Sequence, residues 1–317
     1  MAEPSSGDLR VSIDESTTGD VRAGLAAVAV AVSAWGATGV LIKVIDMNAI
    51  AIAAWRFSIY GMLLTIALHA RGNRLSRRLL VTALPGGALL AADVMLFFVA
   101  VRTTNIVNAT TIGAMQPIVI AAIATRFMGE QIRRREYIAA GVAIAGVLVV
   151  ITQSSGTPEW SGAGDLAAVG ALCAWSGYFI VAKRTAGKLT PHEFTTGTAW
   201  WVGVFAFAVG LVSGQDMSPP PSSEIVPLAA LILVGGVVGH SLMNWGIPRL
   251  PVWLASTMTL MIPVISSLGA WIFLGEALTV WQLVAMAVVI GALWLVVVDQ
   301  TRTPVSPPQD IVDVEPG

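Results

Sequence analysis

The chain has 317 residues, of which 56% are hydrophobic and only 12% are charged, and its formal net charge is −1. A soluble globular protein is about 25% charged, so this composition excludes a water-soluble fold and indicates a protein whose surface faces lipid. No basic patch interleaved with aromatic residues is present, so we expect no nucleic-acid partner. The single cysteine, Cys173, excludes a disulfide framework, and with only three scattered histidines we expect no metal site and no cofactor.

The two ends of the chain are polar. Residues 1–22 carry several acidic residues and lack the basic start and short apolar stretch of a secretory signal, so we expect the first apolar run to remain as a membrane helix. Residues 299–317 are rich in proline and acid. Such compositions bury too little apolar surface to fold. They predict a disordered cytoplasmic tail at each end of the chain.

Ten apolar segments are long enough to cross a bilayer. A span needs about 20 mostly apolar residues in a helix, because helical hydrogen bonds satisfy the backbone where water is absent. The sequence therefore predicts an all-α, polytopic membrane protein with ten transmembrane helices. The predicted spans are residues 23–45, 49–69, 79–101, 105–126, 136–152, 165–183, 193–213, 226–247, 252–274 and 279–298.

The basic residues divide unevenly between the two sides of these spans. With the N-terminus inside, all 18 lysines and arginines lie on the inner side except Lys43 and Arg102, which lie outside, and Arg56, which lies within a span. Lysine and arginine are enriched in cytoplasmic loops near helix ends. This bias predicts a multi-pass protein of the cytoplasmic (inner) membrane with both termini in the cytoplasm.

An internal repeat relates the two halves of the chain. The matched pairs are Trp35 with Trp175 and Lys43 with Lys183 at a shift of 140 residues, and Pro117 with Pro263, Gly129 with Gly275 and Glu130 with Glu276 at a shift of 146. Because each copy contains five spans, an odd number, the second copy must enter the membrane from the opposite side. We therefore predict two inverted five-helix repeats, over residues 23–152 and 164–298, an arrangement typical of secondary transporters with a midplane substrate site.

The repeated motif resembles that of a known family. In each half, a proline in the fourth span is followed some residues later by a Gly-Glu pair. The residue directly before this pair is Leu274 in the second half and Met128 in the first. This pattern is similar to that of the EamA-type ten-helix permeases of the drug/metabolite transporter superfamily, and the likeness covers residues 23–298. The resemblance implies a carrier with a central cavity gated at both ends, whose substrate it does not specify.

Three ionisable residues lie well inside the spans: Arg56, Asp93 and His240. Charges at membrane depth are expensive and point to function. Arg56 and Asp93 lie at similar depths, so we predict that they form a buried ion pair for which a substrate or proton competes, a permanent structural pair being the alternative. His240 is a candidate proton carrier or a hydrogen-bonding packing residue.

Other polar and aromatic residues in the spans are further candidates for the substrate site. Trp35 and Trp175 lie at equivalent, deep positions and are predicted to stack on a substrate or to pack helices together. Asn244 shares a helix face with His240, and Gln116 gives the fourth span a polar surface. These three side-chain types can all bind a polar substrate group or bridge helices.

We expect structural roles for the two prolines and the two Gly-Glu pairs. Pro117 and Pro263 interrupt backbone hydrogen bonding in mid-span and are predicted to be kinks that frame the cavity and bend during gating. Gly129-Glu130 and Gly275-Glu276 are expected to form a tight turn with a carboxylate near the N-terminus of the next helix.

These features favour a secondary transporter over other classes. The first hypothesis is export of a small metabolite such as an amino acid by alternating access, with protons as a candidate coupling ion; the alternative is efflux of cationic drugs. No metalloprotease or phosphate-loop motif is present, so we expect no enzyme. A non-transport scaffold or receptor would give no reason for an inverted duplication. The expected partners are the small-molecule substrate and the lipid bilayer, while oligomeric state, substrate and direction stay open.

Overall fold

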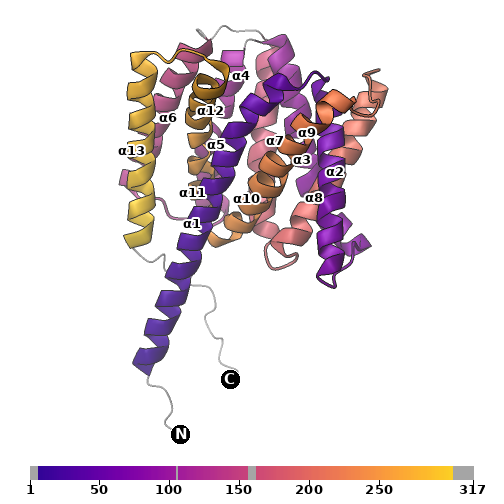
Figure 1. Cartoon of the computed structure of the whole chain (residues 1–317). Helices are drawn as coiled ribbons and strands as arrows, with labels where there is room; N and C mark the ends of the chain where they lie inside the picture. The colour runs from indigo at the N-terminus through magenta and orange to yellow at the C-terminus, as the bar shows by residue number, and fades with distance from the viewer. Residues whose placement is uncertain (1–5, 105, 156–161, 303–317) are drawn as a thin grey trace.

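The computed structural model describes residues 6–104, 106–155 and 162–302. Within them, ten helical stretches are long and apolar enough to cross a membrane. Figure 1 shows these stretches running between the two ends of one bundle. The prediction of an all-α protein with ten transmembrane helices is confirmed, and each predicted span matches an observed stretch to within a few residues.

The first five spans comprise six helices, because the fourth span is interrupted. Helix starts follow local capping rules: the side chains of Asn48 and Ser76 accept main-chain N–H groups at the starts of the second and third helices. The helices are α1 (Ser6–Val44), α2 (Ala49–Ala70), α3 (Arg77–Thr103), α4 (Ile106–Gly113), α5 (Gln116–Phe127) and α6 (Arg134–Ser155).

The start of α1 differs from the predicted boundary. We expected a disordered tail over residues 1–22, but the helix begins at Ser6. The physical reason is that no proline follows Pro4 before the end of α1, so nothing prevents the first span from continuing toward the N-terminus. Residues 1–5 and residues 303–317 of the predicted C-terminal tail lie outside the described part of the chain.

The second five spans contain two irregular stretches. The eighth span includes η2, a π-helix, and the ninth is interrupted like the fourth. Helix α8 starts at a capping box formed by Thr190 and Glu193. The elements are α7 (Ala163–Thr185), α8 (Pro191–Val212), η1 (Ser222–Glu224), α9 (Ile225–Leu231), η2 (Ile232–His240), α10 (Ser241–Gly246), η3 (Ile247–Arg249), α11 (Val252–Met258), α12 (Met261–Leu274) and α13 (Val280–Arg302).

The most extensive helix contacts join one half of the chain to the other. Helix α3 packs on α7 and α8, α2 packs on α8, and α6 packs along α13. Helix α1 packs on α12 and on the eighth span through η2 and α10. Contact of the third span with the sixth thus has a counterpart in contact of the eighth with the first. This exchange of partners is consistent with two inverted repeats, and it places the core at the junction of the halves.

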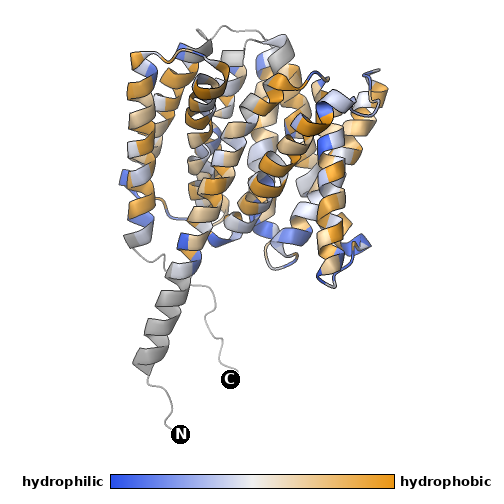
Figure 2. Ribbon diagram, viewed as in Figure 1, coloured by the Kyte–Doolittle hydropathy of each residue, from blue (hydrophilic) through white to orange (hydrophobic). Residues whose placement is uncertain are grey.

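The outside of the bundle is apolar along its length. Figure 2 shows hydrophobic residues over the helices and hydrophilic residues gathered toward the loops. Ile66, Val212 and Trp294 have relative exposures of 60%, 91% and 66%. A water-soluble monomer rarely exposes such continuous apolar surface, whereas lipid tails accept it. The chain is therefore a multi-pass membrane protein.

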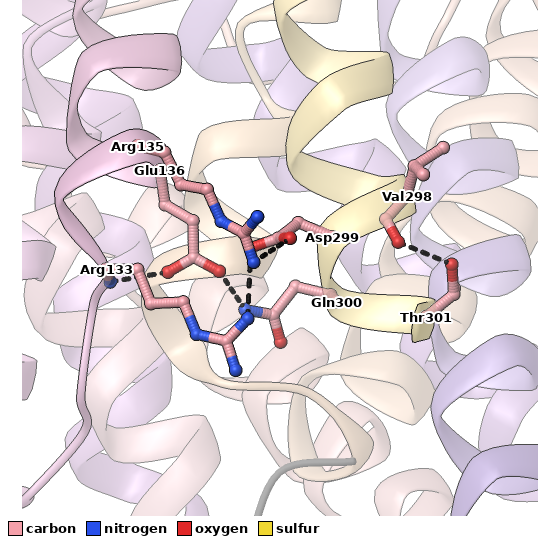
Figure 3. Close-up of polar contacts among 7 residues, drawn as sticks. All are labelled: Arg133, Arg135, Glu136, Val298, Asp299, Gln300 and Thr301. Atoms are coloured by element: carbon pink, nitrogen blue, oxygen red, sulfur yellow. Dashed lines mark hydrogen bonds and ion pairs between the residues drawn. The ribbon is translucent and has the colours of Figure 1, made fainter. Parts of the chain in front are cut away.

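Polar contacts tie α6 to α13 at one end of the bundle. Arg133 and Arg135 both pair with the Asp299 carboxylate, the former at 3.3 Å. Beside them, the Gln300 amide donates to a Glu136 carboxylate oxygen at 2.6 Å (Figure 3). We call this end, which also carries the loop between α7 and α8 and the turn between η3 and α11, the basic end.

Candidate functional site

Trp35 of α1 and Trp175 of α7, which the repeat makes equivalent, meet where the two halves join. Their ring centroids are 5.3 Å apart, edge to face. Trp35 is only 9% exposed, and its indole Nε1 donates to the carbonyl of Gly235 in η2 at 3.1 Å. A buried indole whose N–H is bonded is held in one orientation. The structure therefore places both predicted tryptophans together in the interior.

Toward the basic end, further rings continue from Trp175. It stacks on Tyr178 at a centroid distance of 5.6 Å, and Tyr178 stacks on Phe194 of α8 at 6.0 Å. The buried Tyr178 hydroxyl donates to Asn244 Oδ1 of α10 at 2.7 Å, and the Asn244 amide donates to Thr195 Oγ1 at 3.1 Å. Asn244 thus joins α7, α8 and α10 next to the stacked rings.

In the other direction, the ring contacts continue from Trp35 through His240 to α2. Trp35 and His240 are 5.0 Å apart, and His240 and Phe57 are 5.4 Å apart. The Arg56 guanidinium carbon lies 5.1 Å from the centre of the Phe57 ring. We call the whole chain of contacts the aromatic row. Its members, in order toward the basic end, are Phe57, His240, Trp35, Trp175, Tyr178 and Phe194.

Glycines let the η2 backbone approach the aromatic row closely. A Cβ atom on Gly239 would lie 2.4 Å from the Trp35 indole nitrogen, and one on Gly235 would lie 2.7 Å from Arg56 Nη2. Such distances require the neighbour to move. The π-helical turn is itself a rare conformation that occurs often at functional sites. The backbone of the eighth span therefore forms one wall of the row.

A cavity of about 270 Å³ opens at the basic end and reaches the aromatic row. Phe194, the last ring of the row, and Asn244, bonded to Tyr178, both line it. Asp20 and Arg249 add charged groups to its lining. Pockets that hold small molecules begin at roughly 300 Å³, so the cavity is near the size of a small metabolite. The cavity thus adjoins the end of the row that lies toward the basic end.

The predicted ion pair between Arg56 and Asp93 is not formed. No salt bridge or hydrogen bond joins Arg56 to Asp93 among the residues that the structure describes. The reason is packing: α8 lies against both α2 and α3. Asp93 also shares a face of α3 with Leu89, one turn away, and Leu89 lies beside Gly177 of α7. Asp93 therefore faces α7, whereas Arg56 faces η2.

The fourth and ninth spans are interrupted at matching places, between α4 and α5 and between α11 and α12. Pro117 and Pro263 lie in the first turn after each break, where a missing N–H removes no helical bond. The two spans touch there, because Thr259 Oγ1 donates to Gln116 Oε1 at 3.2 Å. Gln116 is 1% exposed, and its Nε2 has no partner among the described residues. Gln116 thus lies at the meeting point of the two breaks.

The two Gly-Glu motifs form the same turn. Gly129 and Gly275 have φ angles of +70° and +71°, a left-handed conformation that glycine adopts readily. The N–H groups of Glu130 and Glu276 donate to the carbonyl six residues earlier, at 3.1 and 3.3 Å. Each bond closes the helix end behind a left-handed glycine, and it spans one residue more than the bond of a Schellman motif. The turn expected from the sequence is therefore present in both halves.

The Glu130 side chain binds a different helix from the one expected. Instead of the next helix, α6, it caps α11 in the other half: its carboxylate accepts the N–H groups of Val252 and Trp253 at 2.8 and 3.3 Å. The start of α6 is capped by Glu136 instead. The first turn of any helix has free N–H groups, and tertiary packing brings those of α11 to Glu130.

Lys183 holds the other side of the same turn. Its ammonium donates to three main-chain carbonyls, those of Ile247, Pro248 and Leu250. Burial raises the pKa of the nearby Glu130 carboxyl, against the opposing effects of its N–H bonds and the Lys183 charge. We call Lys183 and Glu130 the basic-end clamp, because together they fix the end of the eighth span and the start of the ninth. The side chain of Lys43, the counterpart of Lys183, lies outside the described part of the structure.

Several residues of the row were not singled out from the sequence. Phe57, Tyr178 and Phe194 are ordinary apolar residues of membrane spans, and only their contacts distinguish them. The glycine run before His240 was the available signal, since closely spaced glycines at one helix face permit close approach of another helix.

Comparison with known proteins identifies the class to which this architecture belongs. The family model described as "EamA-like transporter family" matches residues 22–152 and again residues 162–298. The chain belongs to the EamA-like transporter family. The resemblance noted in the repeated proline and Gly-Glu motifs is thereby confirmed, and the family's match to each half separately agrees with the internal duplication.

Relatives of known name are also transporters. An uncharacterized transporter of Bacillus subtilis, YyaM, is 27% identical over 252 residues, which cover 76% of this chain and 82% of that protein. The threonine/homoserine exporter RhtA of Escherichia coli is 23% identical over 198 residues, or 62% of this chain and 64% of RhtA. The matched region thus spans slightly less than two thirds of that exporter.

A solved crystal structure has the same fold. It superposes with a TM-score of 0.75 and covers 90% of this chain and 99% of its own, at 20% sequence identity. The likeness supports the arrangement of the ten helices.

Proposed function

We propose that this EamA-family protein is a secondary transporter that exports a small metabolite such as an amino acid across the cytoplasmic membrane. The observation that carries the proposal is the aromatic row, which runs through the interior from Arg56 to the cavity at the basic end. Rings and isolated polar groups suit an amphipathic solute. The similarity to RhtA, named for threonine and homoserine export, supports the same substrate class.

Transport by alternating access requires each end of the row to open in turn. In the proposed cycle the basic-end clamp sets the position of the ninth span on one side, and the breaks preceding Pro117 and Pro263 let the interrupted spans bend. Inverted repeats support such rocking, because the same motion is available to each half from opposite sides.

The basic end is proposed to face the cytoplasm. Arg133, Arg135 and Lys183 all lie there, and basic residues concentrate on the cytoplasmic side of membrane proteins. The last turn of α13 and the first described turns of α1 lie at this end (Figure 1). Both termini are therefore assigned to the cytoplasm.

Efflux of organic cations is the second candidate, favoured by the unpaired Asp93 carboxylate and by the tryptophan pair. Two observations weigh against it. No ring contact or hydrogen bond joins Asp93 to the row among the described residues, and the charge beside the row is the cation Arg56. A fixed guanidinium repels a cationic solute. We therefore assign Asp93 to proton coupling and the row to the metabolite.

Uptake into inside-out membrane vesicles tests the proposed function. Vesicles with and without the protein are given radiolabelled L-threonine, other amino acids, sugars and organic cations, each with and without a pH gradient. We expect accumulation of one or more amino acids above the protein-free control, increased by the gradient. Accumulation restricted to cations would favour the alternative, and no accumulation or exchange of any solute would contradict transport.

Gly239→Ala is expected to slow this uptake at least about tenfold, because its Cβ displaces the Trp35 indole from the row and a shift of an ångström in a positioning group can cost up to about a hundredfold. Gly141→Ala is the control, since no atom lies within 4 Å of its added Cβ. Initial rates are compared at equal amounts of folded protein. Equal rates in the two variants would show that the close contact at Gly239 is dispensable.

A further inference from the structure

The half-buried guanidinium of Arg56 is a cation without an acidic partner among the described residues. Its Nε is buried and unbonded, and no described residue forms a salt bridge or hydrogen bond with the side chain. It lies seven residues from the start of α2, which is roughly 10 Å into the membrane at 1.5 Å per residue. An unpaired charge at such depth is costly and is kept for function. An anionic group that binds to Arg56 and leaves it in each transport cycle would explain why this charge has no permanent partner.

A second nitrogen without a hydrogen-bond partner in the described part of the chain, Nδ1 of His240, lies near the Phe57 ring that Arg56 also approaches. His240 is 7% exposed, and its Nδ1 has no hydrogen bond among the described residues. The centre of the His240 ring lies 5.4 Å from that of Phe57, and the Arg56 guanidinium carbon lies 5.1 Å from it. Two buried nitrogen groups without partners therefore flank one phenyl ring at the start of the row.

Gly235 of η2 lies against the Arg56 guanidinium. A Cβ on Gly235 would lie 2.7 Å from Arg56 Nη2 and 2.8 Å from Thr38 Cγ2, so any larger residue there would move the guanidinium from its place against η2. The Gly235 carbonyl is already used by the Trp35 indole. The guanidinium thus gains no acceptor from the wall that it touches, and its N–H groups stay free.

We infer that Arg56, with His240 Nδ1 as a second contact, binds the carboxylate of the transported substrate. A planar guanidinium matches a carboxylate with two parallel hydrogen bonds, and one fixed positive charge balances one carboxylate. The faces of the neighbouring rings, Trp35 foremost, accept the apolar or cationic remainder of an amino acid. This inference rests on the proposed function and narrows it to substrates that carry a carboxylate.

Competition in the unmodified protein tests the inference without any substitution. Proteoliposomes loaded with L-threonine exchange it for radiolabelled L-threonine, and unlabelled L-threonine, L-threonine amide or L-threoninol is added outside. We expect the two analogues without a carboxylate to compete about tenfold more weakly, or not at all, because a charge-assisted hydrogen-bonded pair is lost. Equal competition by acid and amide would overturn the inference and leave transport itself established.

Variants locate the carboxylate contact. Arg56→Gln is expected to raise the half-saturating L-threonine concentration at least about tenfold and to remove the preference for acid over amide, with Arg56→Lys intermediate. His240→Phe, which keeps the ring contacts, is expected to raise it about threefold. Arg126→Gln is the matched control, because Arg126 lies 5.5 Å from the adjacent Phe127 ring but is exposed. Retained acid preference in Arg56→Gln would overturn the assignment.

A binding measurement separates this inference from the proposed function. Purified protein in detergent is titrated with acetate, benzoate, L-threonine and L-phenylalanine, and with the corresponding amides, while the thermal midpoint is followed. We expect the carboxylates to raise the midpoint of the wild type and not that of Arg56→Gln. If L-threonine does not exchange but carboxylates still stabilise the wild type alone, the site stands and the amino-acid proposal fails. If no carboxylate stabilises the wild type and no acid preference is seen, the site is refuted.

Discussion

Lys183→Met is expected to cause the largest loss of stability of any single substitution at the basic end, together with a loss of transport. The ammonium of Lys183 donates to three carbonyls that end the eighth span. Methionine fills a similar volume but leaves these carbonyls without that donor. Loss of hydrogen bonds to a charged group, with partly buried acceptors left behind, costs about 3 kcal/mol. The thermal midpoint of the protein in detergent and the initial uptake rate measure the effect.

Lys188→Met is the matched control, because Lys188 lies in the same loop region and is exposed. We expect Glu130→Gln to destabilise less, since an amide oxygen still accepts one of the two N–H groups of α11. Because both members of the clamp hold the same turn, the effects of Lys183→Met and Glu130→Gln should be non-additive in the double variant. Identical midpoints for Lys183→Met and Lys188→Met would contradict the clamp.

Asp93→Asn is expected to abolish the stimulation of uptake by a pH gradient while leaving exchange of internal for external substrate intact. Asp93 has no hydrogen bond or salt bridge among the described residues, and an unpaired carboxyl group at membrane depth is a natural proton carrier. Asparagine keeps its shape and removes its ionisation. The ratio of uptake with and without the gradient should fall to about one, while counterflow stays near the wild-type rate.

Asp216→Asn serves as the control for this prediction. Asp216 lies in the exposed loop after α8, where hydrogen bonds from Ser218 lower the pKa of its carboxyl, and we expect its loss to leave the gradient effect unchanged. A wild-type ratio in Asp93→Asn would assign coupling elsewhere. Loss of counterflow as well would give Asp93 a role in binding substrate rather than in coupling alone.

The arrangement of spans was predictable because hydropathy and charge bias act along the chain. The equivalence and depth of Trp35 and Trp175 were likewise predictable from the sequence repeat, whereas their direct contact was not. The predicted pairing of Arg56 with Asp93 was wrong because the depth of a residue along a helix does not determine the direction in which its side chain points around the helix axis. Helix α8, which follows much later in the chain, packs against both of the helices that carry them.

Contacts between the halves were beyond the reach of local sequence rules. Glu130 was expected to cap the helix that follows it, as local capping patterns suggest, but its bonds go to α11, more than a hundred residues away. Likewise, the π-helical turn at Gly235 and Gly239 has no sequence rule of its own, although the glycines mark the place. Both features depend on packing that only the folded bundle supplies.

Accessibility of a single cysteine in the cavity at the basic end, where the row ends, is the most direct test of the central claim that the substrate passes along the row. In a Cys173→Ser background, Asn244→Cys, with Ala182→Cys as a second site, lines the cavity at the basic end. We predict that a membrane-impermeant thiol reagent labels it in inside-out vesicles and that a transported amino acid slows the labelling. Labelling that is unaffected by saturating amounts of a solute that the same variant transports would contradict a route through the row.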